Sequence, residues 1–247
     1  MVLVGALSGG TVVGRLAAAV ADRFAPPSGA RRRAGLIELT TAVLLAAVVA
    51  RFGVGWNTIP PLVAAVSLVT LSVVDVRSGR LPGAITFPAS AASLAAIGIA
   101  SIATGRPGAV VAAATAALGY GAVMWAAHEL RPSGLGFGDV KLSPLLGLHI
   151  GWTAVTTGQG WSAVVSLLAQ ALVLSCLTGL GIGSLHALLR RRRWRPPTDP
   201  GPIPATPSVR LSAPSSATRL LDTAFPFGPA LAAGTMIVVL FPEALLL

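Results

Sequence analysis

The sequence is short of cysteine and of charge, and both shortages narrow the class of protein. Cys176 is the single cysteine among 247 residues, which excludes an intramolecular disulfide and a multi-cysteine zinc site. Charged residues make up 11% of the chain, about half the share found in soluble domains, while hydrophobic residues make up 54%. The mean hydropathy is +0.79. These values are typical of an integral membrane protein.

Eight apolar runs approach or exceed the length of about 20 residues that spans a bilayer as a helix. They cover approximately residues 2–21, 34–50, 59–74, 84–103, 109–130, 142–157, 161–189 and 226–246. The sequence therefore predicts an all-α polytopic membrane protein with eight transmembrane helices in a single domain, residues 1–247. Within that domain, the basic and Pro/Ser-rich residues 190–224 are expected to form a flexible cytoplasmic loop.

The basic residues predict how the chain is oriented. Of 18 Lys and Arg residues, all but Arg51 and Arg106 fall on one side of the predicted membrane. Because basic residues mark cytoplasmic loops, that side is predicted to face the cytoplasm and both termini to face outwards. The same rule accounts for the net charge of +10, so no nucleic-acid partner is expected. Asp75 and Asp139 then share the cytoplasmic side.

These two aspartates stand at the ends of predicted spans, where an ionisable residue is costly unless it has a use. Asp75 follows the third apolar run, and Asp139 lies in the glycine-rich stretch 134–142 before the sixth. Two neighbouring carboxyls can hydrolyse a peptide bond without a metal. The ionised one takes a proton from water, and the protonated one donates to the substrate carbonyl. We interpret Asp75 and Asp139 as a candidate aspartyl pair.

Structural interpretations of the same residues stay open at this point. Asp75 could be a helix-end acid paired with Arg77 or Arg80, and Asp139 could be the N-cap of the following helix. Lys141 fits a cytoplasmic anchor. The three histidines lack the spacing typical of metal ligands, so neither a metal nor a cofactor is expected.

Four segments, spread over nearly the whole chain, resemble one family. Residues 136–142 read Gly-Phe-Gly-Asp-Val-Lys-Leu and resemble the GxGDxKL motif of the type IV prepilin peptidases, which are aspartic proteases. Residues 75–82, an aspartate followed by a short polar turn and Leu-Pro, resemble the family's other catalytic motif. Gly83 departs from it, because Asn or Asp is usual there. Residues 35–39 and 224–232 are similar to the starts of the family's second and last helices.

The resemblance implies that Asp75 and Asp139 are the catalytic pair and that Gly136, Gly138 and Lys141 support the active-site loop. It implies cleavage of prepilins or pseudopilins at the cytoplasmic face of the inner membrane, after a short basic leader and before the apolar helix. The expected partners are therefore this substrate and the lipid bilayer.

Glu38 is a candidate for supporting the site from the second helix, with no catalytic role assigned to it. Many family members carry a larger first cytoplasmic loop with two CxxC pairs and also methylate the new N-terminus. Here that loop covers only residues 22–33 and has no cysteine. We therefore expect a peptidase without methyltransferase activity.

Other classes of protein stay open on the residues alone. An ion-coupled transporter could use the same acids, although its acids are more often found near the middle of the bilayer beside broken helices. A structural membrane subunit could dock through its basic loop. Within the protease class, an archaeal preflagellin peptidase would share the same chemistry.

Overall fold

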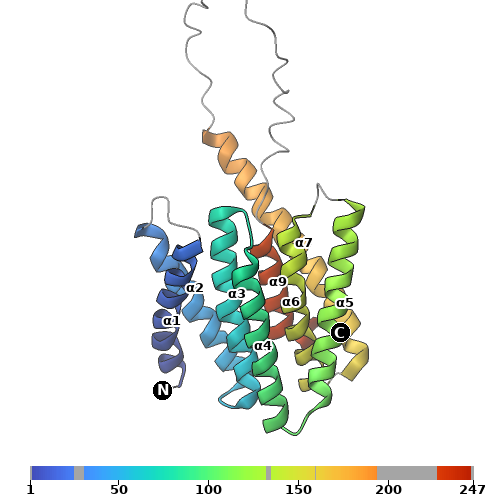
Figure 1. The fold of residues 1–247 in the computed structure, drawn as a ribbon. Helices are drawn as coiled ribbons and strands as arrows, with labels where there is room; N and C mark the ends of the chain where they lie inside the picture. Colours follow the sequence, from blue (N-terminus) through green and yellow to red (C-terminus); the bar gives the residue numbers. More distant parts are fainter. Residues whose placement is uncertain (1, 25–30, 132–134, 159, 194–226, 246–247) are drawn as a thin grey trace, which may run out of the picture. The chain divides into compact units, whose positions relative to one another are not determined.

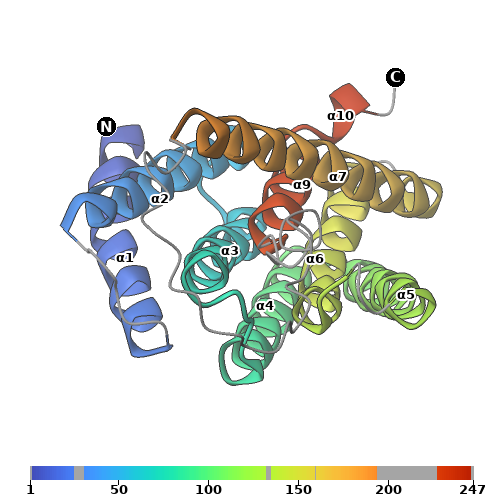
Figure 2. The same ribbon diagram turned by 90° about the horizontal axis from the view of Figure 1, so that it is seen from above.

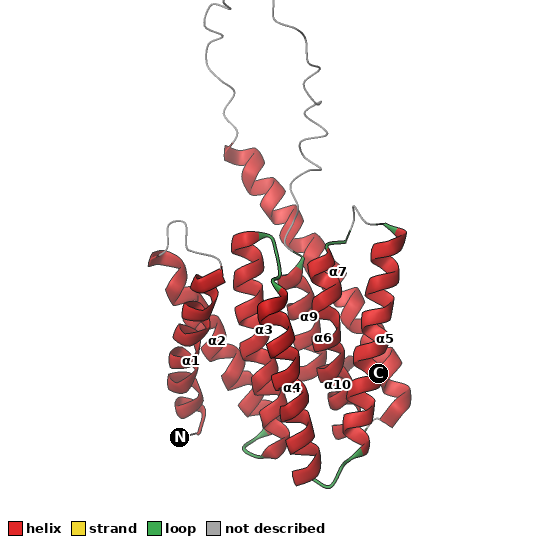
Figure 3. Ribbon diagram, in the orientation of Figure 1, coloured by secondary structure: helices red, strands yellow, loops and turns green. Residues whose placement is uncertain are grey.

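The computed structural model describes residues 2–24, 31–131, 135–158, 160–193 and 227–245. In these ranges all regular structure is helical and no strand occurs (Figures 1 and 3). The long helices are α1 (Val2–Phe24), α2 (Arg31–Phe52), α3 (Ile59–Ser78), α4 (Gly83–Ala103), α5 (Gly108–Leu130), α6 (Phe137–Thr156), α7 (Gly160–Arg193) and α9 (Gly228–Leu240). Two short helices, η1 (Trp56–Thr58) and α10 (Pro242–Leu245), precede α3 and follow α9.

The predicted all-α class is confirmed, and each of the predicted apolar runs overlaps one of the long helices. Among the described residues, five helical segments are long and apolar enough to cross a membrane. These segments are Gly35–Phe52, Trp56–Ser78, Gly83–Ala103, Gly108–Leu130 and Gly160–Leu185. Helix α9 is apolar but has only 13 residues. The protein is thus a multi-pass helical protein, while the count of eight spans and the position of the termini stay predictions.

The chain divides into two units, Met1–Gly179 with Pro226–Leu247, and Leu180–Phe225. In the second unit, α7 stays helical through Arg193. The expected loop 190–224 is therefore corrected at its start, because residues 190–193 belong to a helix. Arginine is a good helix former, and the prediction used only polarity at this point. Residues 194–224 lie outside the described residues.

Helices α3 and α9 occupy the centre of the first unit (Figure 2). Helix α3 packs against α1, α2, α4 and α9, and α9 packs against both α3 and α6. The α5–α6 pair is close because α6 carries glycines where it meets α5. A Cβ atom at Gly147 would lie 2.5 Å from the carbonyl oxygen of Ala116, and one at Gly151 would collide with the carbonyl of Ala112. Small residues at such spacing let two membrane helices approach closely.

This packing predicts a stability effect for Gly147→Ala. The added methyl group has to push α5 and α6 apart, and overpacking of this kind costs about 1–3 kcal/mol. Gly119→Ala in α5 is the matched control, because no atom lies within 4 Å of a Cβ built there. Thermal unfolding of the detergent-purified protein should show a lower midpoint for Gly147→Ala and an unchanged or slightly higher one for Gly119→Ala. Equal midpoints for the two variants would contradict the packing.

Candidate active site

Asp75 lies in the last turn of α3 and is buried, with 6% of its surface exposed. The helix ends at Ser78 because Gly79 adopts φ 61° in the left-handed region, which costs glycine little, and donates its N–H to the Asp75 carbonyl oxygen at 2.7 Å. The short polar turn expected directly after Asp75 begins later than predicted, because residues 76–78 continue the helix.

The carboxyl of Asp75 is held by the beginning of α9. The N–H of Gly228, the first residue of that helix, donates to Asp75 Oδ2 at 3.0 Å. A Cβ atom at position 228 would lie 2.6 Å from the same oxygen, so the contact requires glycine. No role for Gly228 is predicted from the sequence, although its segment resembles a family motif. The available signal was a glycine between Phe227 and Pro229 at the start of an apolar run.

Asp139 lies in the first turn of α6, with 7% of its surface exposed. The interpretation of Asp139 as the N-cap is wrong, because the N-cap is Gly136 and Asp139 is the third residue of the helix. Its own N–H donates to the carbonyl oxygen of Gly136 at 3.0 Å. Asp75 lies in the last turn of α3 and Asp139 in the first turn of α6, and these two helix ends lie at the same end of the first unit (Figure 1).

The residues expected to support the loop surround the first turn of α6. A Cβ atom at Gly138 would lie 3.2 Å from Leu81 Cβ, so glycine there lets α6 approach the segment that follows α3. A Cβ atom at Gly136 would lie 3.4 Å from Asp139 Oδ2, an ordinary contact. The Lys141 ammonium lies over the ring of Phe137, 4.9 Å from its centroid. Close packing against Leu81 thus explains why residue 138 is a glycine, and Lys141 contacts the aromatic ring of Phe137.

The electrostatics of Asp139 connect it to Asp75. Asp139 precedes the sixth apolar run and lies outside the segments long and apolar enough to span a membrane. Burial raises the pKa of the Asp139 carboxyl, the negative charge of Asp75 raises it further, and a backbone hydrogen bond from Gly136 opposes both, leaving a pKa of about 7. The effect of Asp75 means that the two buried carboxyls lie within electrostatic reach of each other.

Two other predicted partners are engaged elsewhere. Glu38 forms an ion pair with Arg15 of α1 at 3.2 Å, so its described contact ties α2 to α1. Arg77, considered as a partner of Asp75, forms an ion pair with Asp22 of α1. In the described part of the chain, no group of three His, Cys, Asp or Glu side chains could hold a metal ion. The site itself offers a pair of buried carboxyls held by backbone donors.

Fold and site together define a class, a multi-pass helical membrane protein with a buried pair of acids. Comparison with known proteins narrows this class. Residues 62–184, about half of the chain and including both acids, match the model of the type IV leader peptidase family. The chain belongs to this family, as the resemblance predicted. No solved structure matches the chain significantly.

Similar proteins carry one name, prepilin leader peptidase/N-methyltransferase. One from Burkholderia pseudomallei (strain 1026b) is 29% identical over 200 residues, which cover 81% of this chain and 57% of that protein. One from Aeromonas hydrophila is 31% identical over 168 residues, covering 68% of this chain and 53% of that protein. One from Xanthomonas campestris pv. campestris is 30% identical over the same length. The chain thus spans little more than half the length of these relatives.

Proposed function

We propose that the chain is a membrane-embedded aspartic endopeptidase that removes the basic leader of type IV prepilins or pseudopilins, with Asp75 and Asp139 as its catalytic pair. The observation that carries the proposal is the placement of two buried carboxyls at one end of the first unit, within electrostatic reach of each other. Membership of the leader peptidase family supports the choice of substrate. The basic loops support a site that faces the cytoplasm from the inner membrane.

The proposed chemistry needs no group beyond the two carboxyls and one water molecule. The ionised carboxyl accepts a proton from water, and the resulting hydroxide attacks the scissile carbonyl carbon. The protonated carboxyl donates its proton to the carbonyl oxygen, which gives a neutral tetrahedral intermediate. Collapse of that intermediate breaks the C–N bond, and the leaving amine takes up a proton. Two like charges so near each other cannot easily both ionise, which keeps the pair in opposite states.

The environments of the two acids favour one division of roles. Asp75 accepts a hydrogen bond from the first backbone N–H of α9, and a helix N-terminus favours a negative charge. Asp139 is buried beside that charge, and its raised pKa of about 7 keeps its carboxyl protonated below that pH. Asp75 is therefore the proposed base and Asp139 the proposed acid, although any measured values belong to the coupled pair.

The test of the proposed function is to mix the detergent-purified protein with a purified prepilin and to determine the product's N-terminus by mass spectrometry. We expect removal of the leader directly before the apolar helix, at one site. We also expect the new N-terminus to carry no methyl group when S-adenosylmethionine is supplied, because the chain has no CxxC pair. An intact prepilin under conditions where a family peptidase cuts it would contradict the proposal.

The pKa of Asp139 predicts the shape of the pH profile. Because this pKa is raised from 3.8 to about 7, the carboxyl is protonated below pH 7 and loses its proton as the pH rises through that value. The proposed acid is then lost, so kcat/KM should fall on the alkaline side of about 7. On the acidic side it should fall again as the proposed base becomes protonated, which gives a bell-shaped profile. A profile that stays flat from mildly acidic to mildly alkaline pH would contradict the shared-proton mechanism.

A further inference from the structure

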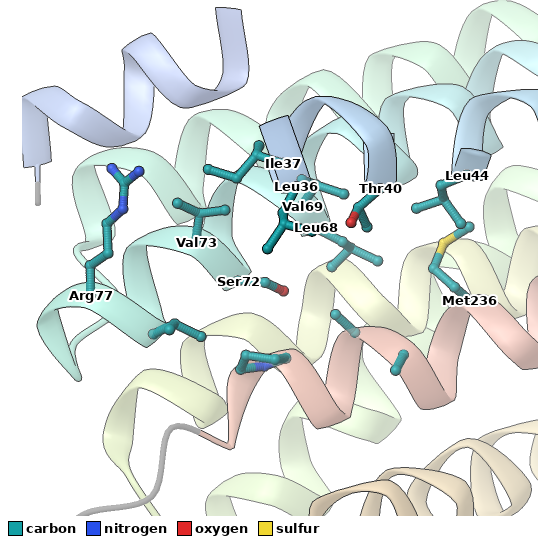
Figure 4. Close-up of a pocket in the computed structure, with 14 residues that line it drawn as sticks. Leu36, Ile37, Thr40, Leu44, Leu68, Val69, Ser72, Val73, Arg77 and Met236 are labelled. Atoms are coloured by element: carbon teal, nitrogen blue, oxygen red, sulfur yellow. The ribbon is translucent and has the colours of Figure 1, made fainter. Parts of the chain in front are cut away.

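An apolar groove lies between α2, α3 and α9, and one end of it is lined by Arg77 in the last turn of α3 (Figure 4). Its volume is about 470 Å³. On each helix the lining residues recur at helical spacing, so that one face of each helix forms one wall. Leu36 and Leu44 mark the two ends of the α2 wall, and Pro229 and Met236 those of the α9 wall. At a rise of about 1.5 Å per residue, the groove follows these helices for roughly 10–13 Å, or about two turns.

One end of the groove is lined by direct sequence neighbours of Asp75 and Gly228, although neither of these residues lines it. Val76 and Arg77, which directly follow Asp75, line its end, and so does Pro229, which follows the Gly228 that binds the Asp75 carboxyl. Arg77 is the charged residue of the lining and lies at this end, where it pairs with Asp22. Beyond that end the walls are almost entirely aliphatic. A chain segment that lies in the groove would therefore have its apolar part along the helices and its polar end at Arg77, in the same last turn of α3 as Asp75.

The α9 wall is suited to a helical occupant. It presents Ala232 and Ala233 to the groove, and small side chains of this kind let another helix backbone come close. Leu36 and Val76, at the margins of the groove, are 62% and 54% exposed, so they are available to cover the sides of an occupant. The volume fits the side chains on one face of a helix, with its other face left toward lipid.

We propose that this groove holds the first turns of the substrate's apolar helix during cleavage, so that the peptide bond just before that helix lies at Asp75 and Asp139. The inference rests on the proposed function, because a prepilin is cut directly before its apolar helix. A lipid chain could fill the same groove, but a lipid-binding groove would not need to end near the cleavage site.

Filling the groove tests this inference. Ala233→Phe places a large side chain in the α9 wall, and Ala95→Phe places the same side chain on an exposed position of α4 as the matched control. If the new phenylalanine prevents one apolar substrate side chain from being buried, binding weakens by about 10- to 100-fold. We therefore expect Ala233→Phe to raise KM for the prepilin by about that factor with the pH profile unchanged, and Ala95→Phe to leave KM within about twofold. Equal KM values for the two variants would overturn the inference.

Photo-crosslinking gives a second readout that tolerates loss of activity. A photoreactive phenylalanine at Thr40, which lines the groove, is compared with one at Leu94, which is 44% exposed on α4, both in the Asp139→Asn background. A prepilin adduct at position 40 and not at position 94 supports the groove. Lipid adducts alone at position 40, or equal prepilin adducts at both positions, overturn it. Cleavage by the unmodified protein is measured in parallel. If it cuts the prepilin, a negative crosslink counts against the groove alone; if it does not, both proposals fall.

Discussion

Replacing either Asp75 or Asp139 by asparagine should abolish leader cleavage while the protein still inserts into the membrane. Asparagine has nearly the same shape as aspartate and keeps an oxygen that can accept the Gly228 N–H, so the fold should survive. It can act neither as a base nor as an acid. General acid–base catalysis contributes about 10²- to 10⁴-fold, and each variant should lose a rate factor in that range. The measurement is the single-turnover rate of prepilin cleavage in detergent, at equal amounts of folded protein.

The control for this pair is Glu129→Gln. Glu129 is an exposed acid near the end of α5 and takes no part in the proposed site. Its substitution removes the same charge and should leave the rate unchanged within about twofold. If Asp75→Asn or Asp139→Asn kept more than a tenth of the activity, that residue would not belong to the catalytic pair. If both variants kept their activity, the proposed aspartyl pair would be wrong, and the transporter or structural-subunit interpretation of these acids would be favoured.

Gly228→Ala should also abolish most of the activity, although it changes no acid. The new methyl group would lie 2.6 Å from Asp75 Oδ2, so either the carboxyl turns away or the start of α9 shifts. Either movement breaks the hydrogen bond from the Gly228 N–H that orients the proposed base. A displacement of about 1 Å in a catalytic group costs on the order of 10²-fold. We expect the single-turnover rate constant to fall at least about tenfold, measured by the same assay.

The matched control is Gly108→Ala. Gly108 is also the first residue of an apolar helix, α5, but no atom lies within 4 Å of a Cβ built there. Because alanine is a better helix former than glycine, this variant should be as stable and as active as the parent. Comparable rates for Gly228→Ala and Gly108→Ala would show that the start of α9 does not orient Asp75.

The helices, and the placement of Asp75 and Asp139 near helix ends, could be predicted from the sequence because their signals are local. Long apolar runs predict membrane helices, and each overlaps a helix in the structure. The order of short motifs indicated the family, which the matched residues 62–184 confirm. The bounds of the helices were predicted less well for a physical reason. An apolar run ends at the first charged residue, whereas a helix continues until its backbone is capped. Helix α3 therefore runs past Asp75 to its cap at Gly79, and α7 runs through Arg193.

The environment of the site could not be predicted from the sequence, because its contacts join residues that are far apart in the chain. The contact between Gly228 and Asp75 joins residues 153 positions apart, and no local sequence pattern predicts such a contact. The partners of Glu38 and Arg77 likewise come from α1, a helix whose position against α2 and α3 depends on tertiary packing. The groove between α2, α3 and α9 needs all three helices to form, so no single segment predicts it.

The central claim, that the two carboxyls act as one unit, is tested most directly by a double-mutant cycle on the cleavage rate. Single-turnover rates are measured for the parent, Asp75→Asn, Asp139→Asn and the variant carrying both, with the product's N-terminus read by mass spectrometry. Residues that act as a unit are strongly non-additive. We predict that the double variant is no slower than the slower single variant. A double variant slowed by the product of the two single effects would mean that the acids act independently, and would contradict a shared proton and a shared water molecule.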